Sequence, residues 1–261
     1  MKENNPDRVI YLADARQSMH FIQVFRCARK TGIVPDTTEL VHIGFGTMNG
    51  KDGKPFKTRD GGVMRLEYLL KEIDDEMLNK IKENQKEKEN LNIDEAEAEQ
   101  TAKTVALAAV KYGDLSNQAS KDYIFDIDRF TSFEGNTGPY ILYTIVRIKS
   151  ILSKYEAKGG DISALKDAIM PAVNAGQKNL MLSLAKFNAT IESAYEESAP
   201  HKICAYIYEL ANAFNGFYHD TKILSEENEE LKKSYISLLV LTKEILEACI
   251  DMLGFSAPDR M

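Results

Sequence analysis

A strand–helix–strand pattern at the start of the chain is the feature that most limits its possible folds. Residues 8–15 contain the apolar run Val-Ile-Tyr-Leu, which is typical of a buried strand. Residues 17–30 carry apolar side chains at the i, i+3, i+4 and i+7 positions of an amphipathic helix, and residues 40–45 form a second strand-like run. A crossover helix joins two strands in parallel. The sequence therefore predicts part of a parallel sheet. Because two strands do not make a stable sheet alone, we expect this part to be incomplete.

From about Val63 the pattern is helical almost to the last residue. The run 83–92 is too polar to pack and is expected to bend at the surface before a helix over 95–112. A polar, turn-rich stretch over 113–139 is expected to connect two parts of the chain. Further helices are predicted over 140–157, 163–168, 171–197, 200–223 and 226–253. The second half therefore predicts an α-helical bundle.

Composition argues against several classes of protein. The formal net charge of −7 disfavours a protein that coats nucleic acid indiscriminately, although it leaves room for a local basic stripe. No apolar run approaches the roughly 18 residues of a membrane span, so we expect no membrane partner. The histidines are scattered, which predicts no metal site. Cys27, Cys204 and Cys249 lie far apart in helix-like apolar stretches, which indicates buried free thiols in a reducing cytosol and a cytoplasmic protein.

Residues 50–62 form a glycine-rich loop that carries Lys51, Lys54, Lys57 and Arg59. Glycines let a backbone turn tightly and approach a ligand, and the cations supply charge for a polyphosphate. A helix start just behind the loop adds free N–H donors. The spacing fits no standard nucleotide motif, and on spacing alone a solvated basic hairpin is the favoured interpretation.

Five segments in order resemble arginyl-tRNA synthetases, from about residue 8 to the last residue. The loop segment Lys-Pro-Phe-Lys-Thr-Arg-Asp-Gly-Gly over 54–62 resembles the one that this family carries in place of the lysine–serine signature of other class I synthetases. The strand–turn–helix over 10–21, the stretch 132–140, the run 212–218 and the terminal Pro-Asp-Arg-Met over 258–261 agree with it. The resemblance implies a C-terminal portion of such an enzyme.

The fold implied is mostly α: a remnant of a parallel, Rossmann-like α/β catalytic domain followed by an all-α helical-bundle anticodon-binding domain. We expect the end of the catalytic domain over 1–115, a connection over 116–139 and the anticodon-binding domain over 140–261.

The resemblance also implies roles in arginine–tRNA ligation. Lys54, Lys57 and Arg59 are expected to contact the pyrophosphate of ATP, which binds as a substrate with Mg²⁺ and not as a tightly bound cofactor. Gln17, at the strand-to-helix turn where open α/β sheets bind ligands, is expected to help hold arginine. Without the family, a helix-capping role for Gln17 is equally acceptable.

His42-Ile43-Gly44 invites comparison with the class I His-Ile-Gly-His signature, but Phe45 stands in the fourth position. We interpret His42 as structural. The family's signature, and its upstream tyrosine and aspartate for the substrate guanidinium, have no counterpart here. We therefore expect that this chain alone does not arginylate tRNA.

Tyr140, Tyr143 and Arg147 fall at i, i+3 and i+7, on one face of a helix. Two rings and a guanidinium on one face suit the stacking and phosphate contacts that unpaired RNA bases need, although core aromatics are an equal alternative from the pattern alone. The family resemblance favours anticodon binding by this face and extends it to Tyr218 and Met261. Arg129 and Lys149 are candidates for additional phosphate contacts.

Three hypotheses remain open at this stage. The first is an arginine–tRNA ligase in truncated form, with an arginine tRNA as partner and with arginine and ATP bound only if a missing half is supplied. The second is a non-catalytic anticodon-binding module, or half of a split synthetase. The third is a helical interaction protein without an RNA role. None of them involves DNA.

Overall fold

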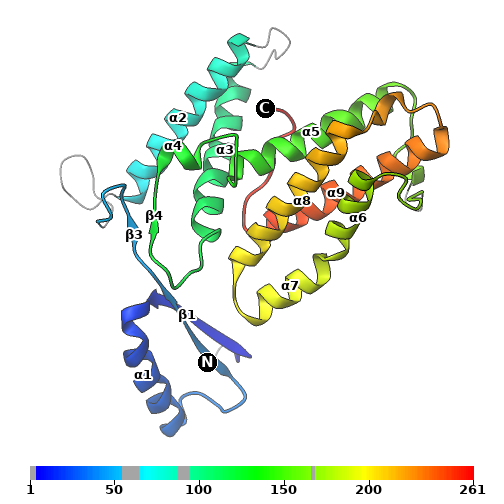
Figure 1. Cartoon of the computed structure of the whole chain (residues 1–261). Helices are drawn as coiled ribbons and strands as arrows, with labels where there is room; N and C mark the ends of the chain where they lie inside the picture. The colour runs from blue at the N-terminus through cyan, green and yellow to red at the C-terminus, as the bar shows by residue number, and fades with distance from the viewer. Residues whose placement is uncertain (1–3, 55–64, 88–93, 166–167) are drawn as a thin grey trace. The chain divides into compact units, whose positions relative to one another are not determined.

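The computed structural model of the chain describes residues 4–54, 65–87, 94–165 and 168–261 (Figure 1). By its internal contacts the chain forms two compact units. Unit 1 comprises Met1–Val63 with Asn117–Asp126, and unit 2 comprises Met64–Ser116 with Ile127–Met261. The domains expected from the sequence were assigned by their expected functions, whereas these units are defined by internal contacts. The expected domain boundaries therefore stay a prediction.

Unit 1 contains the predicted strand–helix–strand element. Strand β1 (Arg8–Asp14) pairs in parallel with β2 (Glu39–Phe45), in a register that places Arg8 opposite Glu39 and Asp14 opposite Phe45. A short 3-10 turn, η1 (Ala15–Gln17), leads into helix α1 (Ser18–Lys30). The prediction of two parallel strands joined by a helix is confirmed.

A second parallel pair in unit 1 escaped the sequence analysis. Strand β3 (Met48–Asn49) pairs with β4 (Tyr123–Ile124), which lies within the stretch expected to be only a connection. The two strands are two residues long, so they carry no alternation that a sequence pattern can reveal.

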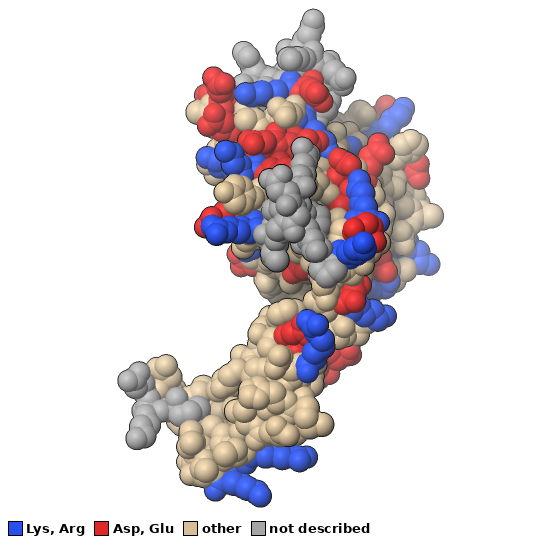
Figure 2. Space-filling model, turned by 90° about the vertical axis from the view of Figure 1, so that its left-hand side faces the viewer, with Lys and Arg blue, Asp and Glu red and all other residues tan. Residues whose placement is uncertain are grey.

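The small sheet leaves much apolar surface uncovered in unit 1. Leu12 of β1 is 71% exposed and Met19 of α1 is 65% exposed, and none of the residues of α1 is buried. Figure 2 shows that the face of unit 1 turned to the viewer carries few charged side chains. Parallel sheets are normally covered on both faces, so this surface agrees with the expectation of an incomplete α/β element.

Unit 2 begins with two paired helices. Helix α2 (Leu66–Glu87) packs along α3 (Glu95–Leu115), and a single turn, α4 (Ile127–Phe130), follows later in the chain. The Asp94 side chain caps α3 by accepting a hydrogen bond from the Glu97 N–H. The buried face of α3 is made largely of small residues, which allow close approach of a neighbouring helix: Ala98, Ala102, Ala106, Ala108, Ala109 and Gly113.

The remaining helices form the bundle that the sequence predicts. They are α5 (Gly138–Ala157), α6 (Ala175–Ala185), α7 (Phe187–Glu196), α8 (Pro200–Asp220) and α9 (Glu229–Met252), with 3-10 turns η2 (Ser163–Leu165) and η3 (Ile223–Ser225). Helix α5 packs against α3, α8 and α9, and α8 also packs against α6 and α7. Helices α5, α8 and α9 run side by side in Figure 1.

Two predicted helices were wrong in extent. The helix expected over 171–197 is two helices, α6 and α7, because the Asn174 side chain caps the Gln177 N–H and a tight turn at Lys186 interrupts the pattern. The helix expected over 163–168 is only the turn η2 in its described part.

The prediction that all three cysteines are buried was wrong for Cys27, which is exposed on α1. Among the described residues α1 packs mainly on β2 and η1, and none of its residues is buried. Cys204 and Cys249 are buried, and desolvation raises the pKa of each thiol to about 12. Both thiols are therefore protonated and unreactive at neutral pH.

Within the described ranges, every helix is too short or too polar to cross a lipid bilayer.

Candidate functional site

The first site is a face formed by α5 and α8 in unit 2. Helix α5 starts where the Thr137 hydroxyl accepts a hydrogen bond from the Tyr140 N–H, with Pro139 in the first turn. This start places Tyr140, Tyr143 and Arg147 on one side of α5, and all three are half-buried. The structure therefore does not bury the two tyrosines as core residues. We call these three residues, together with Asn212, Asn215 and Tyr218 of α8, the α5–α8 face.

A chain of hydrogen bonds links the two helices across this face. The Tyr140 hydroxyl donates to Asn212 Oδ1 at 2.6 Å, and Asn215 Nδ2 donates to the Tyr140 hydroxyl oxygen at 2.9 Å. Arg147 Nη1 donates to Asn215 Oδ1 at 2.6 Å. The Asn215 amide oxygen thus binds Arg147 and its amide nitrogen binds Tyr140, which fixes these two of the three predicted α5 residues relative to each other.

The Arg147 guanidinium also lies against two aromatic rings. Its central carbon is 4.8 Å from the ring centre of Tyr143 and 5.4 Å from that of Tyr218. The Tyr218 ring stacks on Phe214 of its own helix and remains 42% exposed. Cation–π contacts of this kind contribute about 0.5–1 kcal/mol at exposed sites. The arrangement offers a flat aromatic surface beside a cation whose direction is fixed.

Asn212 and Asn215 were not predicted as site residues, although both lie in a segment that carries the family resemblance. Their spacing could have indicated a shared face, since Asn212, Asn215 and Tyr218 lie three residues apart along α8. What the sequence does not reveal is that this side of α8 faces Tyr140 and Arg147, because the pairing of two helices is a tertiary property.

Met261 ends a tail that follows α9, and this tail is attached to α3 and α5. Lys149 contributes to that attachment, because its Nζ lies 3.3 Å from Asp259 Oδ1 in the tail. The same Nζ lies 3.3 Å from Glu247 Oε1 of α9. Its charge is balanced within the chain, which argues against the predicted phosphate contact. Arg129 of α4 is exposed.

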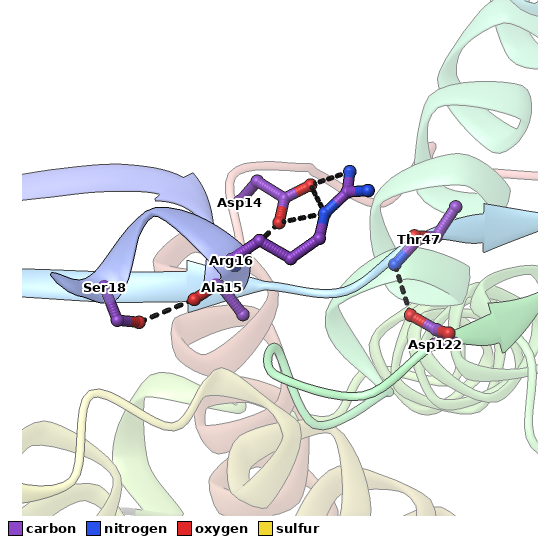
Figure 3. Close-up of polar contacts among 6 residues, drawn as sticks. All are labelled: Asp14, Ala15, Arg16, Ser18, Thr47 and Asp122. Atoms are coloured by element: carbon purple, nitrogen blue, oxygen red, sulfur yellow. Dashed lines mark hydrogen bonds and ion pairs between the residues drawn. The ribbon is translucent and has the colours of Figure 1, made fainter. Parts of the chain in front are cut away.

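The second site lies in unit 1, at the carboxyl end of β1. Gln17 precedes α1 and is exposed, and its side chain makes no capping hydrogen bond, so the alternative of a helix cap is not supported. The single N–H of Arg16 Nε is shared between Asp14 Oδ1 at 2.9 Å and Oδ2 at 3.0 Å, and Arg16 Nη2 donates to Oδ2 at 2.5 Å (Figure 3). These hydrogen bonds, with one from the Arg16 N–H, lower the pKa of Asp14 to about 2. Asp14 is therefore ionised and holds the turn in front of Gln17.

Two glycines let neighbouring backbone approach this edge of the sheet. A Cβ on Gly44 would lie 2.8 Å from Ala15 Cα, and one on Gly46 would lie 2.4 Å from the carbonyl carbon of Lys121. Beyond Gly46 the Thr47 N–H donates to Asp122 Oδ1 at 2.6 Å (Figure 3). The end of β2 is thus held against the turn at η1 and against residues 119–122.

The cationic loop follows β3 and is described only at its start. Lys54 is exposed, and the Gly50 N–H donates to its carbonyl oxygen in a turn that Gly53 closes with φ +71°. Lys51 forms an ion pair with Asp126 at 3.0 Å. Lys57 and Arg59 lie outside the described residues. Among the described residues no group of three or more histidine, cysteine or acidic side chains is suited to hold a metal ion.

His42 packs in unit 1 as a structural residue would. Its ring stacks on Phe21 with 4.5 Å between ring centres and 15° between planes. Its Nε2 atom is buried and has no hydrogen-bond partner in the described part of the chain. This packing agrees with the structural interpretation.

Two families match the chain almost from end to end. Residues 1–127 match the family described as tRNA synthetases class I (R), catalytic domain, and residues 141–261 match the DALR anticodon binding domain. Among curated relatives, the arginine–tRNA ligase of Alkaliphilus oremlandii is 54% identical over 261 residues, and that of Francisella tularensis subsp. tularensis is 43% identical over 262 residues. In each case the match covers 100% of this chain but only 43% of the relative.

Solved structures agree with the sequence matches. The arginyl-tRNA synthetase of Plasmodium falciparum is 27% identical with a TM-score of 0.80, over 99% of this chain and 42% of its own. That of Thermus thermophilus is 25% identical with a TM-score of 0.80, over 98% of this chain and 41% of its own. The chain thus spans less than half the length of these relatives. Because it matches both a catalytic and an anticodon-binding family, and arginine–tRNA ligases along its whole length, it belongs to the arginyl-tRNA synthetases.

Proposed function

We propose that this chain binds the anticodon loop of an arginine tRNA through its α5–α8 face. The observation that carries the proposal is the hydrogen-bonded chain through Asn215, which holds Tyr140 and Arg147 in fixed positions beside the exposed ring of Tyr218. The match of residues 141–261 to an anticodon-binding domain supports it. Such a protein acts in the cytoplasm.

The chemistry of the face suits single-stranded RNA. Unpaired bases stack on aromatic rings, and each stack contributes about 1–3 kcal/mol. Arg147 supplies a cation that is held by Asn215 and two rings, so it is oriented before RNA arrives. Pre-orientation reduces the entropy lost when a phosphate or base edge is bound.

We also propose that unit 1 supplies part of an arginine–tRNA ligase site. In that reaction the arginine carboxylate attacks the α-phosphate of ATP, which binds with Mg²⁺, and cations stabilise the charge that gathers on the phosphates. Lys54, Lys57 and Arg59 are assigned to the phosphates and Gln17 to arginine. The exposure of Gln17 and Lys54 and the position of Gln17 at the carboxyl end of β1 support these assignments.

The anticodon proposal predicts a measurable difference between two RNAs. The full chain is expected to bind an arginine tRNA transcript about 1–3 kcal/mol more tightly than the same transcript with its anticodon bases replaced, at one fixed salt concentration. Tyr218→Ala is expected to remove most of that difference, because it deletes a stacking ring and one of the two rings that hold Arg147. Titration followed by fluorescence anisotropy measures both dissociation constants.

Tyr195 of α7, also an exposed tyrosine in unit 2, provides the matched control. Tyr195→Ala should leave the difference unchanged. Equal, weak and strongly salt-dependent binding of both transcripts by the unmodified chain would contradict anticodon binding and would favour a helical scaffold without an RNA role.

The catalytic proposal predicts that the chain alone does not arginylate tRNA, because it lacks the His-Ile-Gly-His signature. Addition of a second polypeptide that carries the upstream part of a relative is expected to restore attachment of labelled arginine. Robust arginylation by highly purified chain alone would contradict this expectation. Anticodon-dependent binding without restored activity would favour a non-catalytic anticodon-binding module.

A further inference from the structure

The last residues of the chain form a tail without helix or strand that is nevertheless held in place. Helix α9 ends at Met252, and Gly254 adopts φ +80°, which turns the chain out of the helix. From there to Met261 the backbone has no regular structure. Its position is therefore set by side-chain contacts with neighbouring helices.

Lysines of α3 and α5 hold the first part of the tail. Lys111 of α3 donates to the carbonyl oxygen of Gly254. Lys149 of α5 lies 3.4 Å from the carbonyl oxygen of Pro258 and 3.3 Å from Asp259 Oδ1. Lys149 Nζ also forms an ion pair with Glu247 Oε1 of α9 at 3.3 Å.

A two-pronged ion pair holds the residue just before the terminus. Arg260 Nε donates to Glu97 Oε1 at 2.6 Å, and Arg260 Nη2 donates to Glu97 Oε2 at 2.7 Å. Bidentate pairs of this kind fix direction as well as distance, which a single lysine contact does not. Glu97 is itself held, because it lies in the first turn of α3 and its N–H donates to the capping carboxylate of Asp94.

Helix α5 contributes residues both to the α5–α8 face and to the attachment of the tail. Lys149, which holds Asp259, comes two residues after Arg147 on α5. Glu97, which holds Arg260, lies on α3, against which α5 packs. The tail that ends in Met261 is thus attached both to α5, which carries Arg147, and to α3, on which α5 packs.

We propose that Glu97 is a positioning residue for RNA binding: its bidentate pair with Arg260, with the Lys149–Asp259 contact, holds the tail so that Met261 meets the bound anticodon loop. This proposal rests on the proposed function, because it needs an RNA at the α5–α8 face. Glu97 does not itself touch the RNA. It lies within residues 1–127, the part of the chain that matches the catalytic family, and not in the anticodon-binding match.

The first experiment measures the tail in the absence of RNA. The full chain, ending at Met261 without an added tag, is treated with a carboxypeptidase, and release of Met261 is followed by mass spectrometry. Glu97→Ala and Glu97→Gln are expected to accelerate release about three- to fivefold, the change that loss of an exposed ion pair brings to a local opening. Glu230→Ala, which removes the same charge from an exposed ion pair of α9, serves as the control and should change nothing.

The second experiment measures RNA discrimination. Glu97→Ala is expected to reduce the ratio of dissociation constants for anticodon-replaced and unmodified arginine tRNA transcripts about three- to fivefold. Removal of Met261 should reduce the ratio equally, and the two changes together should cost no more than either alone, because they act on one contact. Arg260→Glu should also reduce the ratio, and the exchange Glu97→Arg with Arg260→Glu should restore it.

The outcomes separate the two proposals. Unchanged release of Met261 in Glu97→Ala would overturn the attachment of the tail by Glu97. Faster release with unchanged discrimination would overturn the positioning role while leaving anticodon binding intact. If the unmodified chain does not distinguish the two transcripts, the proposed function fails together with the role of Met261, and the carboxypeptidase result alone then decides whether the ion pair holds the tail.

Discussion

Gly138→Ala is expected to lower the free energy of unfolding by about 3 kcal/mol, the upper part of the range for overpacking a closed interface. A Cβ at this position would lie 2.3 Å from the carbonyl oxygen of Ala108 and 2.6 Å from its carbonyl carbon. Both atoms belong to the backbone of α3, so no side-chain rotation relieves the clash. Helix α5 must move away from α3 to accommodate the methyl group.

Urea unfolding followed by circular dichroism measures this effect. Gly216→Ala on α8 is the matched control, because a Cβ there meets no atom within 4 Å. In a helix interior that change is expected to stabilise by roughly 0.5–1 kcal/mol. Equal effects of the two substitutions would contradict the close contact between α5 and α3.

Asn215→Leu is expected to weaken binding of the cognate transcript by about 2–3 kcal/mol, or roughly 30- to 150-fold in Kd. Leucine has a similar size but accepts no hydrogen bond from Arg147 and donates none to Tyr140. Tyr140 and Arg147, two of the three predicted RNA contacts of α5, then lose the hydrogen bonds that fix them. The loss should therefore reach or exceed the effect of Tyr218→Ala, which removes one ring.

Anisotropy titration measures this loss, and a thermal melt of the free protein shows whether the fold is retained. Asn188→Leu, at an exposed asparagine of α7, controls for the addition of an apolar side chain to unit 2. Binding that is as tight in Asn215→Leu as in Asn188→Leu would show that the hydrogen-bonded chain does not prepare the face for RNA.

The fold could be predicted where local pattern and tertiary packing agree. The apolar runs of β1 and β2 and the amphipathic stripe of α1 were sufficient to predict a parallel pair with its crossover helix. The same patterns failed where tertiary contacts decide the structure. Strands β3 and β4 are too short to show a period, and α6 and α7 are separated by a turn at Lys186 within one continuous helical pattern.

The candidate site divides in a similar way. The spacing of Tyr140, Tyr143 and Arg147 predicted one face of a helix, and family resemblance added Tyr218, which the structure brings to the same face. Asn215 was missed because its importance depends on which side of α8 meets α5. Lys149 was expected to contact phosphate because a lysine on a binding helix has that chemistry, but Glu247 and Asp259 already bind it.

The close approach of α5 to α3 has a consequence for chimaeric enzymes. Gly138 lies in the first turn of α5, just before the anticodon-binding match begins, and it is against the backbone of α3 at Ala108, within the catalytic-domain match. The rest of α5, which packs on α3, belongs to the anticodon-binding match. In a hybrid that joins residues 1–127 of one relative to residues 141–261 of another, α3 therefore comes from one parent and most of α5 from the other, so the interface between these helices is no longer native. Such hybrids should inherit α3 and α5 together, with the crossover point upstream of α2, if the recombined protein is to fold.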